Sequence, residues 1–295
     1  LKIDWFERLL FIFDQNYECY YTTYLVKKNN WSKMKFLSPA KLNLNLRVIS
    51  KRIDGYHNLE TTFQFIDLFD EITFEKSNES FNISCDGLEI EPENNLIFKS
   101  FNAIKEYYEV DEGIQIHLKK NIPVGAGLGG GSSNAATTLI ALNKIWGLGL
   151  SGEELAKIGK PLGADIPIFI YGKNAIATGI GDIFLDVEFR KNKFLLICPN
   201  IEVSTGEMFR KLKIDKLSPK HQNSFLDTLL RENKSIEEFY ASNINDYDLK
   251  LSGTGSTLFI EYDKKDDLEK ILQKIPKNWR FFFCEGLQYS PLTGV

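Results

Sequence analysis

The sequence predicts an α+β fold in two domains, for three reasons. Strand patterns with a period of two are mixed with helical patterns, and the early strands are joined as in hairpins, unlike those of a doubly wound parallel sheet. A charged segment at 190–193 interrupts the pattern. With 295 residues, the chain is long enough for two domains or one large one. We therefore expect domains at 34–190 and 191–295.

Alternating residues predict the first strand. Even-numbered residues from 40 to 48 are apolar and odd-numbered residues from 41 to 47 are polar, so this strand should be half-buried, with Lys41 and Asn43 on its polar face. An Asp-Gly turn at 54–55 precedes a second strand that starts near Leu59. Further strands are expected at 72–74, 81–85 and 114–118, and helices at 95–108, 134–146 and 152–159.

The second expected domain has a similar mixture of patterns. It opens with an apolar strand at 194–198, and a helix around Met208 follows. The remaining elements are expected as helices at 235–242 and 266–274 and as strands at 257–262 and 280–284.

The composition argues against several classes of protein. Hydrophobic residues make up 43% of the chain, which excludes a disordered or fibrous protein. The net charge of −4 gives no basic excess for nucleic acid, and no run approaches the roughly 18 apolar residues of a membrane span. With only three histidines (His57, His117 and His221), a multi-histidine metal site is not expected. The four cysteines, Cys19, Cys85, Cys198 and Cys284, lie far apart in the sequence, which predicts reduced thiols in the cytoplasm. A disulfide between two of them is the alternative.

The first 33 residues differ from the rest of the chain. They are rich in aromatic residues, their longest apolar run is too short for a secretion signal, and the first methionine is Met34. An added arm packed on the surface is one explanation. Upstream sequence joined by a mis-assigned start is the explanation we favour, and nothing catalytic is apparent there.

A glycine-rich loop before an expected helix is the strongest motif in the chain. Its five glycines leave backbone N–H groups uncovered, and the helix N-terminus adds partial positive charge, so the loop suits a phosphate. A flexible turn is the alternative. Ser132 or Ser133 is a plausible N-cap of the helix. The loop consists of Pro123, Val124, Gly125, Ala126, Gly127, Leu128, Gly129, Gly130, Gly131, Ser132 and Ser133.

Two common phosphate loops do not fit this motif. A Walker A loop needs Lys before its Ser or Thr, and no Lys precedes Ser132. Gly125, Gly127 and Gly130 match G-x-G-x-x-G, but a dinucleotide site also needs a second parallel strand ending in an acidic residue about 20 residues on. The segment there is expected to be helical, so the dinucleotide alternative fails.

The loop resembles the phosphate loop of the GHMP superfamily of small-molecule kinases, which includes galactokinase, homoserine kinase, mevalonate kinase and phosphomevalonate kinase. Residues 38–44 resemble the N-terminal strand motif of that superfamily, and residues 251–256 resemble its C-terminal glycine motif. The resemblance implies an N-terminal domain similar to ribosomal protein S5 and a ferredoxin-like C-terminal domain. It also implies a second glycine loop made of Gly253, Thr254, Gly255 and Ser256.

One branch of the superfamily is most similar, the 4-diphosphocytidyl-2-C-methyl-D-erythritol kinases of the non-mevalonate isoprenoid pathway. The similar segments are 39–44, 54–59, 63–65, 163–167 and 203–205, and the resemblance runs from residue 34 to about residue 262. Two positions depart from the family pattern. Ser224 stands where the family usually has Asp, and Asp182 stands where Glu is common.

This resemblance implies that Lys41 and Asp165 form the catalytic pair. An alcohol attacks phosphorus poorly until a base takes its proton, which a carboxylate at hydrogen-bond distance does. A nearby lysine keeps that carboxylate ionised and neutralises charge on the transferring group. On the residue pattern alone, Asp165 could instead cap the turn before Ile166, and Lys41 could be a solvated strand residue.

The substrate end of the site is expected at a second cluster. Tyr56 and His57, in the Asp-Gly loop, could stack on a pyrimidine and hydrogen-bond its edge. The resemblance implies Phe209 as the opposing ring and Asn43 as a further substrate contact. A loop histidine without a role and a core phenylalanine are the structural alternatives.

The predicted activity is ATP-dependent phosphorylation of the 2-hydroxyl of 4-diphosphocytidyl-2-C-methyl-D-erythritol, with Mg²⁺ bridging phosphates and Ser133 as a candidate metal contact. Another alcohol kinase of the superfamily is one alternative. A non-catalytic nucleotide-binding protein is the other. We expect a cytoplasmic monomer or weak homodimer with no nucleic-acid or membrane partner.

Overall fold

The computed structural model describes residues 32–294 except for 79, 87–90, 109, 111, 190 and 218–221. The expectations for residues 1–31 with Cys19, for Arg190 and for His221 therefore lie outside the described residues. Within the described ranges, no helix is long and apolar enough to cross a bilayer.

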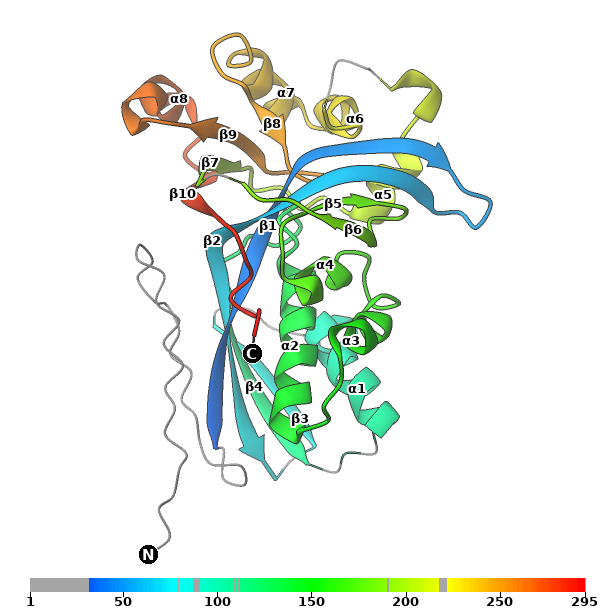
Figure 1. Cartoon of the computed structure of the whole chain (residues 1–295). Helices are drawn as coiled ribbons and strands as arrows, with labels where there is room; N and C mark the ends of the chain where they lie inside the picture. The colour runs from blue at the N-terminus through cyan, green and yellow to red at the C-terminus, as the bar shows by residue number, and fades with distance from the viewer. Residues whose placement is uncertain are drawn as a thin grey trace, which may run out of the picture.

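A long antiparallel hairpin connects the lower and upper parts of the molecule (Figure 1). It consists of β1 (Lys33–Lys51) and β2 (His57–Ser77), which turn at the expected Asp-Gly sequence. The two expected strands near residue 59 and at 72–74 are parts of the single strand β2. No Gly or Pro interrupts residues 57–77, so nothing in the sequence breaks the ladder.

A β-bulge in β1 changes which side chains share a face. Asn43 pairs with Phe63, whereas Leu46 pairs with Thr61, so Leu44 is the extra residue. Phe63 and Thr61 lie two residues apart on one face of β2, and their partners Asn43 and Leu46 therefore share a face of β1. The expected unbroken alternation from 40 to 48 is wrong. Val48 follows Leu46 on the Asn43 side, and Arg47 lies on the other.

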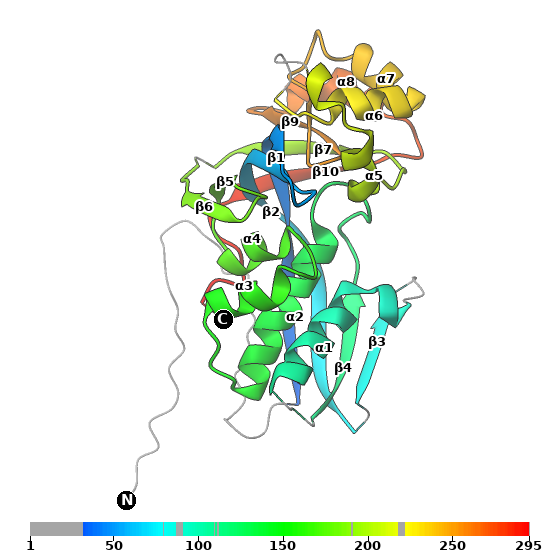
Figure 2. The same ribbon diagram turned by 90° about the vertical axis from the view of Figure 1, so that its right-hand side faces the viewer.

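Helices cover one face of the lower sheet (Figure 2). β4 is antiparallel to β2 and parallel to β3, while β5 joins β2 to the edge strand β6. The buried core between this sheet and the helices is built mainly from Phe, Ile, Leu and Ala side chains. The elements are β3 (Phe81–Cys85), α1 (Leu96–Tyr108), β4 (Gly113–Lys119), α2 (Gly130–Trp146), α3 (Gly152–Gly159), α4 (Ile166–Tyr171), β5 (Ala175–Thr178) and β6 (Ile183–Asp186).

The upper part continues the sheet in the order β2-β10-β7-β9-β8, and α6, α7 and α8 lie above it in Figure 1. The tip of the β1–β2 hairpin packs into the upper core through Leu46, Val48 and Leu59. A third buried cluster lies between the two cores. The elements are β7 (Lys193–Cys198), α5 (Thr205–Lys211), α6 (Leu226–Glu232), α7 (Lys234–Ala241), β8 (Lys250–Leu251), β9 (Leu258–Tyr262), α8 (Glu269–Lys274) and β10 (Arg280–Leu287).

The mixture of helices with mainly antiparallel strands confirms the predicted α+β class. Most predicted elements are present within a few residues, and α3 has the predicted bounds, with a capping box between Ser151 and Glu154. Helices α4 and α6 and strands β5 and β6 were not predicted, because they are only four to seven residues long. The domain division at 190–193 stays a prediction.

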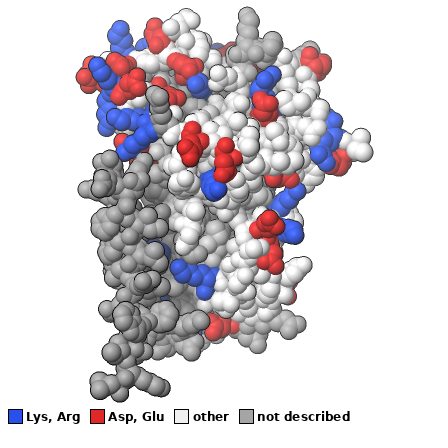
Figure 3. Space-filling view, in the orientation of Figure 1, with Lys and Arg blue, Asp and Glu red and all other residues white. Residues whose placement is uncertain are grey.

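The described cysteines are all free: Cys85 is partly buried, and Cys198 and Cys284 are buried. Burial in the apolar cluster raises the pKa of Cys198 to about 11 and also raises the pKa of Cys284, so both stay protonated at neutral pH. On the face in Figure 3, acidic and basic side chains are interspersed.

Candidate active site

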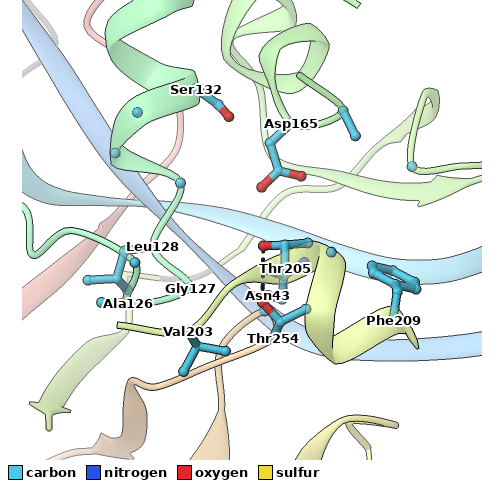
Figure 4. A pocket seen from close by; sticks show the side chains of 18 of the residues that line it. Asn43, Ala126, Gly127, Leu128, Ser132, Asp165, Val203, Thr205, Phe209 and Thr254 are labelled. Atoms are coloured by element: carbon cyan, nitrogen blue, oxygen red, sulfur yellow. Dashed lines mark hydrogen bonds between the residues drawn. The ribbon is translucent and has the colours of Figure 1, made fainter. Parts of the chain in front are cut away.

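A cavity of about 1320 Å³ lies between the lower and upper parts of the molecule. Its walls come from both ends of the chain: β1, the hairpin tip, the glycine-rich loop, the start of α4, α5 and the segment before β9. In Figure 4, Ser132 and Asp165 lie on one side of the cavity, and Val203, Thr205 and Thr254 lie on the other. All of the glycine-rich loop from Pro123 to Ser132 lines this cavity.

Four consecutive carbonyl groups of the glycine-rich loop, those of residues 125–128, are bound by the protein. Gly125 O accepts from Val203 N at 2.9 Å, and Ala126 O accepts from Thr257 N at 3.1 Å. Gly127 O accepts from Ser252 Oγ at 3.0 Å, and Leu128 O accepts from Lys41 N at 3.1 Å. These carbonyls are therefore bound by three different segments, an arrangement that suits an anion at the N–H groups of the loop.

The side chains of the loop alternate in a way that supports this arrangement. Ala126 and Leu128 are buried in the cluster between the two cores, whereas residues 125, 127 and 129 are glycines with positive φ. A Cβ on Gly127 would lie 2.3 Å from Ser252 O and 2.9 Å from Gly255 O. Only glycine therefore allows the backbones of the two glycine loops to approach this closely.

The second glycine loop reaches the cavity only in part. Gly253 and Thr254 line the cavity, and Thr254 Oγ1 lies 3.3 Å from Thr205 Oγ1 (Figure 4). Gly255 and Ser256 do not line it, since Gly255 packs near Leu229 and the Ser256 hydroxyl donates to Ile201 O at 2.7 Å.

Asn223 fixes the second loop and was not singled out as a site residue from the sequence. Its Nδ2 donates to Leu251 O at 2.9 Å and to Gly253 O at 2.8 Å, and its backbone forms a bridge with Leu46 of β1. An asparagine in a segment without regular periodicity gives little signal beyond the family pattern. Ser224, the family departure beside it, has a local role: its hydroxyl accepts from Val48 N at 3.0 Å.

The start of α2 differs from the prediction. The helix begins at Gly130, and the N-cap is Gly129 in the left-handed conformation, with φ of 73°. Ser132 and Ser133 are thus in the first turn, and the predicted serine cap is wrong, because a left-handed cap position favours glycine. The N–H groups of Gly130, Gly131 and Ser132 are first-turn donors with no acceptor inside the helix.

Only one of the two serines faces the cavity. Ser132 lines it, whereas the Ser133 side chain is fully buried and its Oγ lies 2.8 Å from Ser38 Oγ. Ser38 donates its one hydroxyl proton to Asn134 Oδ1 at 2.8 Å, so the Ser133 hydroxyl donates to Ser38. Ser133, the candidate metal contact, therefore lies on the β1 side of the helix and away from the cavity.

Lys41 lies against Asp165 as the catalytic hypothesis requires. Its Nζ is 3.2 Å from Asp165 Oδ2, donates to Asn43 Oδ1 at 2.5 Å, and donates more weakly to Gly127 O at 3.4 Å. The ammonium has three donors and three acceptors, and it also lies 5.5 Å from the centre of the Phe63 ring. The Lys41 side chain is 3% exposed, so the protein holds its charge in one place.

Asp165 occupies the N-cap position of α4 but does not cap the helix. Its side chain makes no cap hydrogen bond, and it points into the cavity (Figure 4). The carboxylate is 38% exposed, which leaves one side open to a ligand. The turn-capping alternative for Asp165 is therefore not what the structure shows.

The aromatic cluster lies at the hairpin tip and on α5. His57 packs against Phe209, with ring centres 5.1 Å apart and planes inclined by 31°, while Tyr56 is 59% exposed. All three line the cavity. Burial, with a smaller effect of Lys51, lowers the pKa of His57 below its ordinary value of 6.5. His57 is therefore neutral at pH 7, with one donor and one acceptor nitrogen.

A buried carboxylate, which was not predicted from the sequence, anchors the turn that precedes the loop. Asp70 is fully buried and accepts from Lys120 Nζ, Asn121 N and Ile122 N at 2.7–2.8 Å. Burial lowers the pKa of Lys120, and Asp70 opposes that effect. This turn packs against Gly130 at the start of α2.

The comparisons with known proteins agree with one another. The family model for the GHMP kinases N-terminal domain matches residues 95–173. A 4-diphosphocytidyl-2-C-methyl-D-erythritol kinase of Marinomonas sp. (strain MWYL1) is 41% identical over 272 residues, which cover 88% of this chain and 89% of the relative.

Solved structures show the same similarity in three dimensions. The crystal structure of a 4-(cytidine 5'-diphospho)-2C-methyl-D-erythritol kinase matches with a TM-score of 0.74 and 26% identity, covering 86% of this chain and 99% of that one. A homoserine kinase from Cytophaga hutchinsonii matches with a TM-score of 0.64 and 17% identity, covering 90% and 98%. The second match supports the fold alone.

Proposed function

Because this chain belongs to the family of 4-diphosphocytidyl-2-C-methyl-D-erythritol kinases, we propose that it transfers the γ-phosphoryl group of ATP to the 2-hydroxyl of 4-diphosphocytidyl-2-C-methyl-D-erythritol. This is a step of the non-mevalonate isoprenoid pathway. The observation that carries the proposal is the Lys41–Asp165 contact of 3.2 Å, beside a loop whose carbonyls at residues 125–128 are bound by the protein.

Asp165 acts as the general base in this proposal. The open side of its carboxylate takes the proton of the 2-hydroxyl as the oxygen attacks phosphorus. Lys41 lies beside Asp165 and balances the negative charge of the transferring group, since its ammonium is fixed by Asn43. The two side chains come from β1 and the start of α4, which the fold holds together.

The glycine-rich loop binds the nucleotide phosphates. The free N–H groups at the start of α2 and the partial positive charge of the helix suit the β- and γ-phosphates of ATP. Mg²⁺ prefers oxygen ligands and keeps several of its waters, and the Ser132 hydroxyl, which lines the cavity, fits this better than the buried Ser133. The ion would supply charge neutralisation between the phosphates.

The hairpin tip binds the cytosine end of the substrate. Tyr56 offers an exposed ring for stacking, and the neutral His57 offers one donor and one acceptor to a base edge that also carries both. The cavity connects this tip to Lys41 and Asp165, so one ligand can reach both.

A coupled ADP-release assay tests the proposed function. The protein is incubated with ATP and either the cytidyl substrate, mevalonate, homoserine or galactose. Turnover only with the cytidyl substrate supports the proposal. Turnover with one of the other alcohols instead would show a different kinase of the superfamily, and ATP binding without any turnover would show a non-catalytic nucleotide-binding protein.

Asp165→Asn keeps the size of the side chain and removes the base, so turnover should fall by roughly 10²–10⁴ while ATP binding persists. Asp186→Asn is the matched control, because Asp186 also forms an aspartate–lysine pair, at 2.8 Å from Lys173, but does not line the cavity. Near-normal turnover of Asp165→Asn would contradict the assigned base.

An ATP-using biosynthetic enzyme of this kind would act in the cytoplasm, as a monomer or weak homodimer.

A further inference from the structure

The hydroxyl of Thr61 stands at the end of a chain of hydrogen bonds that leads to Lys41. Thr61 lies on β2 and is 1% exposed. Its Oγ1 donates to Asn45 O at 2.6 Å and accepts from Asn43 Nδ2 at 2.8 Å. On the other side of the same amide, Asn43 Oδ1 accepts from Lys41 Nζ at 2.5 Å.

The hydrogen bonds that link Thr61, Asn43 and Lys41 have only one consistent direction of donation. A hydroxyl has a single proton, and the carbonyl of Asn45 can only accept, so the Thr61 proton is used there. Thr61 must then accept from the Asn43 amide nitrogen, which turns Oδ1 of Asn43 toward Lys41. The reversed amide would place NH₂ groups against the Lys41 ammonium and an oxygen against an oxygen, so two hydrogen bonds would be lost.

The β-bulge of β1 places the groups that make this series of hydrogen bonds possible. Lys41 and Asn43 precede the extra residue Leu44, and Asn45, whose carbonyl accepts from Thr61, follows it. Thr61 itself pairs with Leu46, directly beyond the bulge. A regular ladder would bring a different residue opposite Thr61.

We propose that Thr61 is a positioning residue for phosphoryl transfer: its hydroxyl fixes the Asn43 amide, which holds the Lys41 ammonium beside Asp165. The inference rests on the proposed function, since it assigns Thr61 to the reaction of that pair. Thr61 lines the cavity, but its hydroxyl is bound by Asn43 and Asn45. Its loss therefore lowers kcat and leaves the binding of ATP nearly unchanged.

The test compares three variants in the ADP-release assay. Thr61→Val has nearly the same shape without the hydroxyl, and its kcat should fall about 10-fold, the effect of one lost hydrogen bond in the chain. Thr61→Ser keeps the hydroxyl and should restore most of the wild-type kcat. Thr62→Val is the matched control, because Thr62 is the neighbouring threonine on the opposite face of β2, and its kcat should not change.

KM values and a double variant separate positioning from general structural damage. Thr61→Val should change KM for ATP by less than about twofold, because the lost bond lies outside the glycine-rich loop, and KM for the cytidyl substrate should change less than kcat. In an Asn43→Ala background, Thr61→Val should cost nothing further, since Thr61 acts through Asn43. Should Thr61→Val fold poorly, Thr61→Ala removes the same hydroxyl and should give the same kcat.

Three results would overturn the inference: a normal kcat for a folded Thr61→Val or Thr61→Ala protein, equal losses in Thr61→Ser and Thr61→Val, or additive losses in the double variant. The proposed function is tested separately in the same assay. Wild-type protein without turnover of the cytidyl substrate would contradict that function. Wild-type turnover that Asp165→Asn abolishes and Thr61→Val leaves intact would remove only the inference about Thr61.

Discussion

One end of the cavity is formed by backbone groups and the other by side chains. At the glycine-rich loop, backbone groups make the site, and three segments of the protein hold the carbonyls of residues 125–128. At the hairpin tip, a few side chains make it: Tyr56, which is 59% exposed, and His57, which packs on Phe209. The first end is therefore sensitive to a Cβ added where the two glycine loops meet, as at Gly127, whereas the second is sensitive to the identity of single side chains.

This difference corresponds to what each end has to recognise. A phosphate group is the same in every nucleotide, and backbone N–H groups bind it without a particular side chain. A pyrimidine ring differs from other bases only along its edge and needs placed donors and acceptors. We therefore expect variants at the loop to affect ATP, and variants at the tip to affect only the second substrate.

Gly127→Ala should have the largest effect of these variants. Its Cβ would meet Ser252 O at 2.3 Å and separate the two glycine loops, so ATP affinity should fall roughly 100-fold or more. Gly147→Ala is the control, because Gly147 also has a positive φ, of 64°, but nothing lies within 4 Å of its Cβ. Calorimetric titration with ATP measures both. Equal ATP affinities of the two variants would show that backbone strain, and not the contact between the loops, matters.

Tyr56→Ala should have an intermediate effect at the other end. Loss of one stacking partner should cost roughly 1–3 kcal/mol of binding of the cytidyl substrate, while ATP affinity stays unchanged. Tyr56→Phe keeps the ring and should bind as well as the wild type. If Tyr56→Ala weakens both ligands equally, the two ends are not separate and the hairpin tip is structural.

A pH dependence should be the smallest effect. The pKa of His57 is lowered from 6.5, so the ring is neutral at pH 7 and becomes protonated only as the pH falls below that value. A protonated ring has two donors and no acceptor, so KM for the cytidyl substrate should rise a few-fold as the pH falls toward 5. In His57→Asn this rise should be absent. A rise of KM for ATP in parallel would point to a group at the loop instead.

The sign of the matching stability change follows from the same pKa. The folded protein disfavours the charged form of His57, so this residue contributes stability above its unfolded pKa, and that contribution is lost as the pH falls.

Local patterns in the sequence allowed much of the fold to be predicted. The glycine-rich loop, the helix after it and the strand with Lys41 each follow from neighbouring residues. The bounds of α3 were also predicted, and in the structure a capping box between Ser151 and Glu154 stabilises its start. The roles of the site residues stay predictions. The structure shows where they lie, and it places Lys41 and Asp165 in contact.

The errors share a physical cause, since each depends on contacts between distant segments. Ser133 has the same hydroxyl as Ser132, and only the packing of α2 on β1 decides which of them faces the cavity. Leu46 and Val48 continue the apolar alternation of β1, so the sequence gives no sign that the strand changes face at Leu44. Thr61 and Asn223 act through residues far away in the chain.

The bulge at Leu44 makes the length of β1 matter more than the identity of the residue there. Leu44 is only half-buried, so replacing it by another apolar side chain should disturb little. Removing it would restore a regular ladder, turn Leu46 and Val48 away from the upper core, and bring Arg47 into their place. Among related chains, point substitutions should therefore accumulate at this position, while insertions and deletions between Asn43 and Leu46 should be rejected.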